Sequence, residues 1–228
     1  MGTEELKPAY YALRRGGWRD YVTVLHVPYT AWHLSYVAVG ASLAPHFHTG
    51  RMLWTLAAFA LALGIAAHAL DEQHGRPLRT EIPSSVLAAL AVASLAGACA
   101  IGVWAAFAWD EPGLLAFVAV GGLATPAYNL EWLGGALHNA WGFALTWGAF
   151  PVLTAYFAQA GTIRGEALLA AGYAALLTYV QRTLSTPVRS ARRTLGTTEH
   201  VEPLELSLRI LPWANVLLAC ALVVARLT

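Results

Sequence analysis

Charged side chains are scarce in this sequence of 228 residues. Asp, Glu, Lys and Arg together make up 12% of the chain, whereas a soluble globular domain carries about 25%. Hydrophobic residues reach 57%. A soluble surface needs more polar side chains than this composition supplies, so it favours an integral membrane protein over a soluble domain. The formal net charge of +1 is uninformative by itself, and nucleic-acid binding has no support in the sequence.

Cysteine is also rare. The two that occur, Cys99 and Cys220, both fall inside apolar stretches and are not spaced as metal ligands. We therefore expect two small buried thiols rather than a disulfide. The chain has no internal repeat, no low-complexity tract and no linker long enough to divide it, which predicts one domain.

Long apolar runs fill most of the chain. Each has at least the roughly 17 residues that a membrane-spanning helix needs. Seven such runs occur, at residues 22–44, 51–70, 82–109, 112–128, 136–158, 163–182 and 206–227. The fourth is the weakest because Gly121, Gly122 and Pro126 interrupt it. The pattern predicts an all-α, polytopic integral membrane protein with about seven transmembrane helices, its helical domain covering residues 22–228.

Residues 1–21 precede the first apolar run and mix aromatic with basic side chains. We expect an interfacial helix that anchors the chain at the membrane surface and ends at Gly16-Gly17. The first twenty residues are too polar for a secretory signal peptide, because no apolar segment precedes a cleavage site.

Basic residues divide unevenly between the two sides of the predicted bundle. With a cytoplasmic N-terminus, the outer side holds only Arg51, Arg164 and Arg226. The inner side holds Lys7, Arg14, Arg15, Arg19, Arg76, Arg79, Arg182, Arg189, Arg192, Arg193 and Arg209. Cytoplasmic loops carry an excess of Lys and Arg, so this division predicts a prokaryotic plasma-membrane protein with a cytoplasmic N-terminus. The cluster from Arg182 to Arg193 also suits contact with anionic lipid headgroups.

A short polar string closes the second apolar run, from His68 to Pro77. On a continuing helix His68, Asp71 and Glu72 stand at positions i, i+3 and i+4, so all three project from one face. Ionisable side chains near a membrane are costly and normally mark a functional site. A salt-bridge network within the loop is the alternative interpretation of the same residues.

Other segments bring polar side chains to the same predicted end of the bundle. They are His26 and His33 in the first run, Tyr128, Asn129 and Glu131 after the fourth, His138 in the fifth, and Arg182 and Arg189 around the end of the sixth. Together with the polar string they predict a cavity open to the cytoplasm. Each residue alone has a structural alternative, such as a hydrogen bond between helices or a charge at headgroup level.

The mixture of imidazoles and carboxylates predicts a divalent-metal site without identifying the metal. Mg²⁺ prefers carboxylate oxygens, whereas imidazole suits Fe, Mn or Zn. The candidate ligands are His33, His68, Asp71, Glu72, Glu131 and His138.

Three motifs along the chain can be compared with a known family. The first is the stretch from Asp71 to Pro77, which contains Arg76-Pro77. The second is Tyr128-Asn129 with Gly134 and the run from Trp141 to Pro151, and the third is Ser185-Thr-Pro-Val-Arg189. With these motifs the chain resembles, over about residues 20–200, the UbiA-type superfamily of intramembrane prenyltransferases. The first motif is similar to a shortened first acidic motif of that family, the second to the region of its fourth and fifth helices, and the third to the segment after its second acidic motif.

The resemblance implies a UbiA-like helical bundle that binds a prenyl diphosphate through Mg²⁺ held by acidic motifs. It gives Asp71, Glu72 and Tyr128 catalytic roles, and it assigns substrate binding to Arg76, Asn129, Arg182 and Arg189.

The sequence also departs from that family. Gln181 and Arg182 stand where the family has its second set of aspartates, and no acidic residue occurs between Glu166 and Glu199. The family usually has more membrane spans than the seven counted here. The histidines of the candidate metal site are not part of the family pattern.

Prenyl transfer is the favoured hypothesis. Metal and arginines would neutralise the leaving diphosphate, and aromatic side chains would stabilise the allylic cation. One alternative uses the His/carboxylate site to hold iron, manganese or zinc for oxidation, hydration or hydrolysis of a lipid. Another is a non-catalytic membrane subunit that binds a quinone or polyprenyl lipid. The aromatic candidates are Tyr29, Trp32, Tyr36, Tyr128 and Trp132. The acceptor, the prenyl length and the oligomeric state stay open.

Overall fold

The computed structural model describes residues 6–228 and contains helices but no β-strand in this part of the chain. The helices are α1 (Trp18–Val24), α2 (Val27–Leu43), α3 (Thr49–Phe59), α4 (His68–Gln73), α5 (Ser84–Ala108), α6 (Leu114–Asn129), α7 (Trp132–Gly135), α8 (Ala140–Ala144), α9 (Phe150–Ala160), α10 (Gly165–Ser190) and α11 (Glu202–Leu227). Each predicted apolar run is mostly helical, which confirms the all-α prediction.

Three π-helical segments connect or extend these helices. Ala60–Ala67 joins α3 to α4, Leu145–Ala149 joins α8 to α9, and Ala191–Leu195 extends α10. A short 3₁₀ turn, Glu199–Val201, leads into α11. The chain is therefore continuously helical from Thr49 to Gln73 and from Ala140 to Ala160.

Among the described residues, three helical segments are long and apolar enough to cross a membrane: Thr49–Gln73, Ser84–Ala108 and Glu199–Leu227. This number is smaller than the seven predicted. α2 has 17 residues and α6 has 16. At 1.5 Å per residue such helices reach about 25 Å, which is less than the roughly 30 Å hydrocarbon core of a bilayer. The three long apolar helices indicate a membrane-associated protein.

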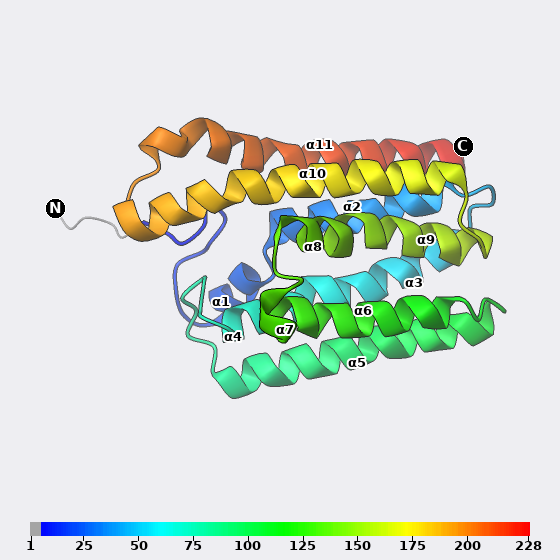
Figure 1. Ribbon diagram of the computed structural model, residues 1–228, viewed down its shortest axis with the longest axis horizontal. Helices are drawn as coiled ribbons and strands as arrows, with labels where there is room; N and C mark the ends of the chain where they lie inside the picture. Colours follow the sequence, from blue (N-terminus) through cyan, green and yellow to red (C-terminus); the bar gives the residue numbers. More distant parts are fainter. Residues whose placement is uncertain (1–5) are drawn as a thin grey trace.

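The helices lie side by side along the long axis of the molecule (Figure 1). α2 is central, because it packs against α3, α9, α10 and α11. Trp32 and Tyr36 of α2 are fully buried there, in a cluster with Val152 of α9. Gly40 lets α2 and α9 approach closely, since a Cβ atom at this position would clash with the Val152 carbonyl oxygen.

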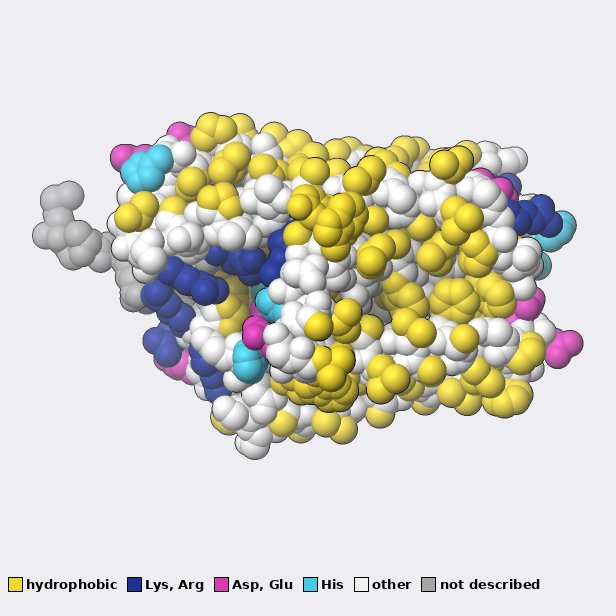
Figure 2. Space-filling model, in the orientation of Figure 1, with side chains coloured by type: hydrophobic (Ala, Val, Ile, Leu, Met, Phe, Trp, Pro, Cys, Tyr) yellow, Lys and Arg dark blue, Asp and Glu magenta, His cyan; other side chains and the backbone are white. Residues whose placement is uncertain are grey.

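Charged side chains gather at the two ends of the molecule, and the face between them is largely hydrophobic (Figure 2). The N-terminal segment, α4 and the α10–α11 connection lie at one end, and the C-terminus lies at the other (Figure 1). At that second end Arg51 pairs with Glu111 at 3.6 Å, and Arg226 donates to the Ala44 carbonyl at 2.9 Å. This distribution suits a molecule whose middle is embedded in lipid.

Residues 6–17 form turns and bends, so the expected N-terminal helix is wrong for this part; residues 1–5 lie outside the described residues. Gly16 and Gly17 have φ values of 103° and 64°, which an α-helix does not contain. Asp20 fixes the segment by accepting hydrogen bonds from the Gly16 and Glu81 amides, at 2.9 and 2.7 Å. We call residues 6–17 the N-terminal strap.

Both cysteines are free, but they are less buried than expected. Cys99 on α5 is half-buried and Cys220 on α11 is exposed. The expectation was wrong because apolar residues on a helix that can face lipid need not point into the protein core.

Candidate functional site

A polar cavity of about 660 Å³ lies between α2, α4, α6, α10 and the strap. Dark blue basic side chains surround a hollow at this end of the molecule (Figure 2). Every predicted site residue except Glu72 and Arg76 lines it: His33, His68, Asp71, Tyr128, Asn129, Glu131, His138, Arg182 and Arg189. Residues from distant parts of the chain therefore meet at one place, as the sequence predicted.

The three π-helical segments all contribute to the wall of this cavity. Leu63 and Ala67 come from the first segment, Trp147 from the second, and Arg192 and Arg193 from the third. A π-helical turn shifts the register of the residues after it, and such turns are frequent at functional sites. The local helix geometry thus aims several wall residues at the same space.

Glu72 is fully buried and braces a loop instead of facing the cavity. Its two carboxylate oxygens accept hydrogen bonds from the Leu78 amide at 2.9 Å, the Thr80 amide at 2.8 Å and the Thr80 hydroxyl at 2.8 Å. α4 ends at Gln73, so Glu72 lies in its last turn, beside the loop that follows the helix and carries Leu78 and Thr80. Glu72 therefore braces the loop through hydrogen bonds instead of facing the cavity as the predicted metal ligand.

Arg76 also belongs to this loop. Its guanidinium donates to the Thr80 carbonyl at 3.3 Å, the Ile82 carbonyl at 2.6 Å and the Ser84 hydroxyl at 2.9 Å. These contacts fix the loop against the start of α5. The expectation that Arg76 faces Arg182 across the cavity mouth is therefore wrong.

Tyr128 and Arg182 form one wall of the cavity. The Arg182 guanidinium donates to the Tyr128 hydroxyl at 2.6 Å and lies 5.5 Å from the centre of the Phe143 ring. The His138 ring stacks on Tyr128, with 4.7 Å between ring centres. Because Tyr128 accepts from Arg182, its own hydroxyl proton stays available for a ligand.

The cavity mouth carries charges of both signs. Arg189 and Arg193 line it and act electrostatically on Asp71. Within residues 6–228, no hydrogen bond or ion pair engages either guanidinium. Glu131 is exposed, and its carboxylate lies 4.0 Å from the His138 Nδ1 atom.

Asn129 is buried below the mouth. Its amide group donates to the Thr125 carbonyl at 2.7 Å. Its side-chain oxygen is not used by that bond, so it can still accept a hydrogen bond from a ligand.

Three histidines in the wall are oriented through their Nδ1 atoms. His33 contacts the Trp147 carbonyl at 2.9 Å, His68 contacts the Gly64 carbonyl at 3.2 Å, and His138 contacts the Tyr128 carbonyl at 3.1 Å. A carbonyl oxygen only accepts hydrogen bonds, so each Nδ1 carries the proton. In the neutral ring Nε2 is then an acceptor.

The strap closes one side of the cavity, which sequence reasoning missed. Tyr10 and Tyr11 line the cavity, and the Tyr11 hydroxyl lies 2.8 Å from Nδ1 of His26. Burial raises the pKa of Tyr10 to about 12 and raises that of Tyr11 well above its usual value, so both hydroxyls are protonated at neutral pH. Aromatic and basic residues in one segment also suit a membrane surface, so the sequence carried no signal for this position.

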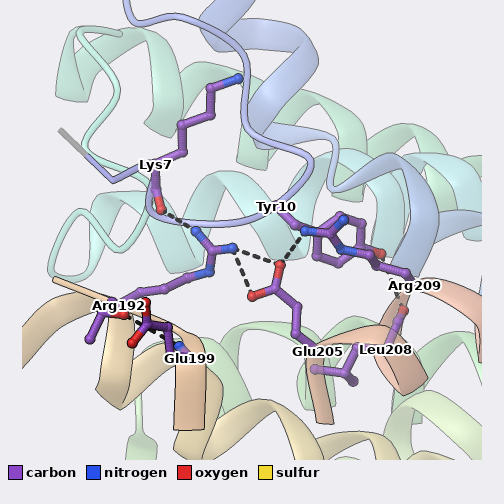
Figure 3. A network of polar contacts seen from close by, with 8 residues as sticks. Lys7, Tyr10, Arg192, Glu199, Glu205, Leu208 and Arg209 are labelled. Carbon is purple, nitrogen blue, oxygen red and sulfur yellow. Dashed lines mark hydrogen bonds and ion pairs between the residues drawn. The ribbon is translucent and has the colours of Figure 1, made fainter. Parts of the chain in front are cut away.

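A buried ion network holds the strap (Figure 3). Arg192 donates to the Lys7 carbonyl at 2.8 Å and to both carboxylate oxygens of Glu205, at 2.7 and 2.8 Å. Arg209 donates to the same carboxylate at 2.6 Å, and the Tyr10 hydroxyl donates to the Leu208 carbonyl at 3.2 Å. The network therefore ties the strap to α10 and α11.

The predicted aromatic chamber is only partly present. Tyr29 and Tyr128 line the cavity. Trp32 and Tyr36 are instead fully buried between helices, where the Trp32 indole donates to the Tyr36 hydroxyl at 2.6 Å. Trp132 is 46% exposed and lies outside the wall. Trp32 and Tyr36 therefore serve helix packing, and Trp132 lies at the surface.

The donor set does not fit a magnesium ion held by paired acidic motifs. Glu72 uses both oxygens on the loop, and Gln181 and Arg182 occupy the second motif position. Within residues 6–228, no group of three or more His, Cys, Asp or Glu side chains is arranged to hold a metal ion. Mg²⁺ prefers carboxylate ligands, and in the described part of the chain the wall offers only Asp71 and Glu131 beside its arginines.

Comparison with known proteins adds no assignment. No protein-family model, no curated protein and no solved structure matches this chain.

Proposed function

We propose that this protein is a UbiA-like integral membrane enzyme that acts on a prenyl diphosphate at the polar cavity. The observation that carries the proposal is the position of Arg182, Arg189 and Arg193 around one cavity. Guanidinium groups form paired hydrogen bonds with phosphate oxygens and neutralise their charge. Three cationic side chains beside apolar residues suit an amphiphile with an anionic headgroup.

The apolar part of the ligand has a surface to contact in the same cavity. Leu63, Phe143 and Trp147 line it together with the arginines. An isoprenoid chain would bury apolar area against these side chains, which stabilises binding. A free phosphate or nucleotide would leave that surface uncovered, so a lipidic phosphate ester fits better.

The proposed reaction breaks the bond between the first prenyl carbon and the diphosphate oxygen. The electron pair of that bond leaves with the diphosphate, whose added charge the arginines stabilise. Tyr128 donates its free hydroxyl proton as a hydrogen bond to the same headgroup, since Arg182 orients the phenol. The Tyr29 and Tyr128 rings face the cavity and can stabilise positive charge on the prenyl carbon.

We also propose the membrane orientation that the basic residues favour. The end with the strap, the cavity and the cluster from Arg182 to Arg193 would face the cytoplasm of a prokaryotic cell. The opposite end carries Arg51, Arg164 and Arg226. Seven spans require α2 and α6 to cross with their ends in the headgroup region, since both are short.

Arginine-to-lysine variants test the proposed function. We expect Arg182→Lys and Arg189→Lys to weaken binding of geranyl diphosphate by at least about tenfold, because a lysine keeps the charge but loses the paired contacts. Geraniol has no phosphate, so its affinity should not change. Binding is measured on purified protein in detergent, with Arg164→Lys at the opposite end as the control.

The outcomes separate the candidate functions. Absence of geranyl diphosphate binding by the parent protein contradicts the proposal. Binding without turnover for any acceptor favours the lipid-binding subunit, and a tightly held transition metal in the purified protein favours the metalloenzyme.

A further inference from the structure

The cavity has a second polar region whose chemistry differs from that of the arginine side. Its wall carries hydrogen-bond acceptors without protein donors. Gln181 is 4% exposed, and its side-chain oxygen is shielded from solvent with no hydrogen-bond partner among residues 6–228. Burying an acceptor without a hydrogen-bond partner is destabilising, so such a group in a cavity wall points to a bound donor.

His68 adds a second acceptor with a defined tautomer. Its Nδ1 faces the Gly64 carbonyl at 3.2 Å and the Thr30 hydroxyl oxygen at 3.5 Å. Thr30 already uses its only hydroxyl proton on the Leu25 carbonyl at 2.6 Å, so it can only accept from His68. Both contacts require the proton on Nδ1, which makes Nε2 of the neutral ring an acceptor.

The neighbouring rings keep His68 in place. His26 stacks on it with 4.1 Å between ring centres and an angle of 10° between the planes. His33 has the same Nδ1–carbonyl arrangement, through the Trp147 carbonyl at 2.9 Å. Two oriented imidazoles and the Gln181 amide thus line one cavity as acceptors.

We propose that this region binds the second substrate through an O–H donor, and that Nε2 of His68 accepts the proton of that hydroxyl during transfer. The transfer step of this inference rests on the proposed function. The preference for binding an O–H donor does not depend on it. The substrate class is an alcohol or phenol rather than a carboxylate, because a carboxylate would offer no donor to these acceptors.

The proton and electrons balance in this step. The prenyl carbon loses its bond to diphosphate, and the electron pair leaves with the diphosphate oxygen. A lone pair of the acceptor oxygen forms the new carbon–oxygen bond. The hydroxyl proton moves to Nε2 of His68, so the products are a prenyl ether, diphosphate and protonated His68.

Two matched probes test the binding preference without requiring turnover. 1-Naphthol has one O–H donor, and 1-methoxynaphthalene replaces that donor with a methyl ether. We expect the parent protein to bind 1-naphthol at least about tenfold more tightly, and this ratio to fall to near one in His68→Ala. Gln181→Leu removes another of the three acceptors at similar volume and should also lower the ratio.

Controls separate the possible failures. His46→Ala changes an exposed histidine at the opposite end and should keep the parent ratio. Geranyl diphosphate binding should persist in His68→Ala, which shows that the variant is folded and that the arginine side is intact. Absence of diphosphate binding by the parent contradicts the proposed function.

Equal parent affinities for the two naphthalene probes, with normal diphosphate binding, overturn this inference alone.

A spectroscopic check uses protein labelled with ¹⁵N-histidine, in which the nitrogen resonances report the protonated ring position. His68 should show a protonated Nδ1, and addition of 1-naphthol should shift its Nε2 resonance. A protonated Nε2 in the ligand-free protein overturns the inference.

Discussion

Asp71 and Glu72 are neighbours in the chain with different surroundings. Asp71 lines the cavity, where Arg189 and Arg193 act on it. Glu72 is fully buried and accepts three hydrogen bonds from the loop at residues 78–80. One residue thus belongs to the ligand site and the other to the framework that supports it.

This difference predicts opposite effects of two conservative substitutions. Glu72→Gln loses one acceptor oxygen and leaves a buried loop donor unpaired, so the free energy of unfolding should fall by about 1–3 kcal/mol. Thermal unfolding in detergent should show a lower midpoint, with geranyl diphosphate binding retained below it.

Asp71→Asn should leave the unfolding midpoint near that of the parent. Its lost negative charge should strengthen geranyl diphosphate binding by about twofold or more, because a repulsive charge beside Arg189 is removed. Weaker binding in this variant would mean that Asp71 holds a cation for the diphosphate, and arginines alone would no longer explain the site.

At the scale of elements, the strap and the ends of α10 and α11 form one unit. The strap has no helix of its own, and its position depends on hydrogen bonds to the α10 and α11 region and on the hydrogen bond from the Gly16 amide to Asp20. Arg192 and Glu205 are both nearly buried, with side chains 6% and 5% exposed. A buried pair of this kind is sensitive to loss of one partner.

Removal of Arg192 should therefore release the strap. We expect trypsin to cleave Arg192→Leu at the exposed Arg14-Arg15 pair at least about tenfold faster than the parent protein, because more open strap is available to the protease. The control is Arg209→Leu: the Arg209 side chain is 53% exposed, so its loss costs less. Cleavage of Arg192→Leu at the rate of the parent protein would show that the network does not hold the strap.

At the scale of the whole molecule, the charges lie at two ends and the apolar surface lies between them (Figure 2). The cavity and the basic cluster share one end. If this end faces the cytoplasm, a water-soluble acceptor or released diphosphate would exchange with that compartment, while an isoprenoid chain would remain in contact with the bilayer.

Cysteine labelling of intact cells tests this orientation. In a background that carries Cys99→Ala and Cys220→Ala, we expect an impermeant thiol reagent to label Arg164→Cys and to leave Gln73→Cys unlabelled until the cells are opened. Both positions are exposed in the fold, so access to the reagent depends on the side of the membrane. Labelling of Gln73→Cys in intact cells would reverse the proposed orientation.

The amino-acid sequence determined the helical class, because long apolar runs specify helices by a local periodicity and composition. It also determined which segments supply the cavity. The order of the runs places His33, His68, Tyr128 and Arg182 toward the same end of the helical bundle, and all four line the cavity. Apolar length alone did not fix the number of membrane-crossing helices, because α2 with 17 residues and α6 with 16 are each shorter than the corresponding apolar run.

Only the tertiary structure decided the direction of individual side chains. Spacing placed Asp71 and Glu72 near one face, but the loop after α4 supplies donors that orient Glu72 away from the cavity. The Arg76 guanidinium is likewise oriented by a backbone carbonyl group of the loop, that of Ile82, to which it donates a hydrogen bond. The strap lies against α10 and α11 through contacts between Lys7 and Arg192, far apart in the chain. Such contacts depend on distances between separate segments, which local sequence patterns do not encode.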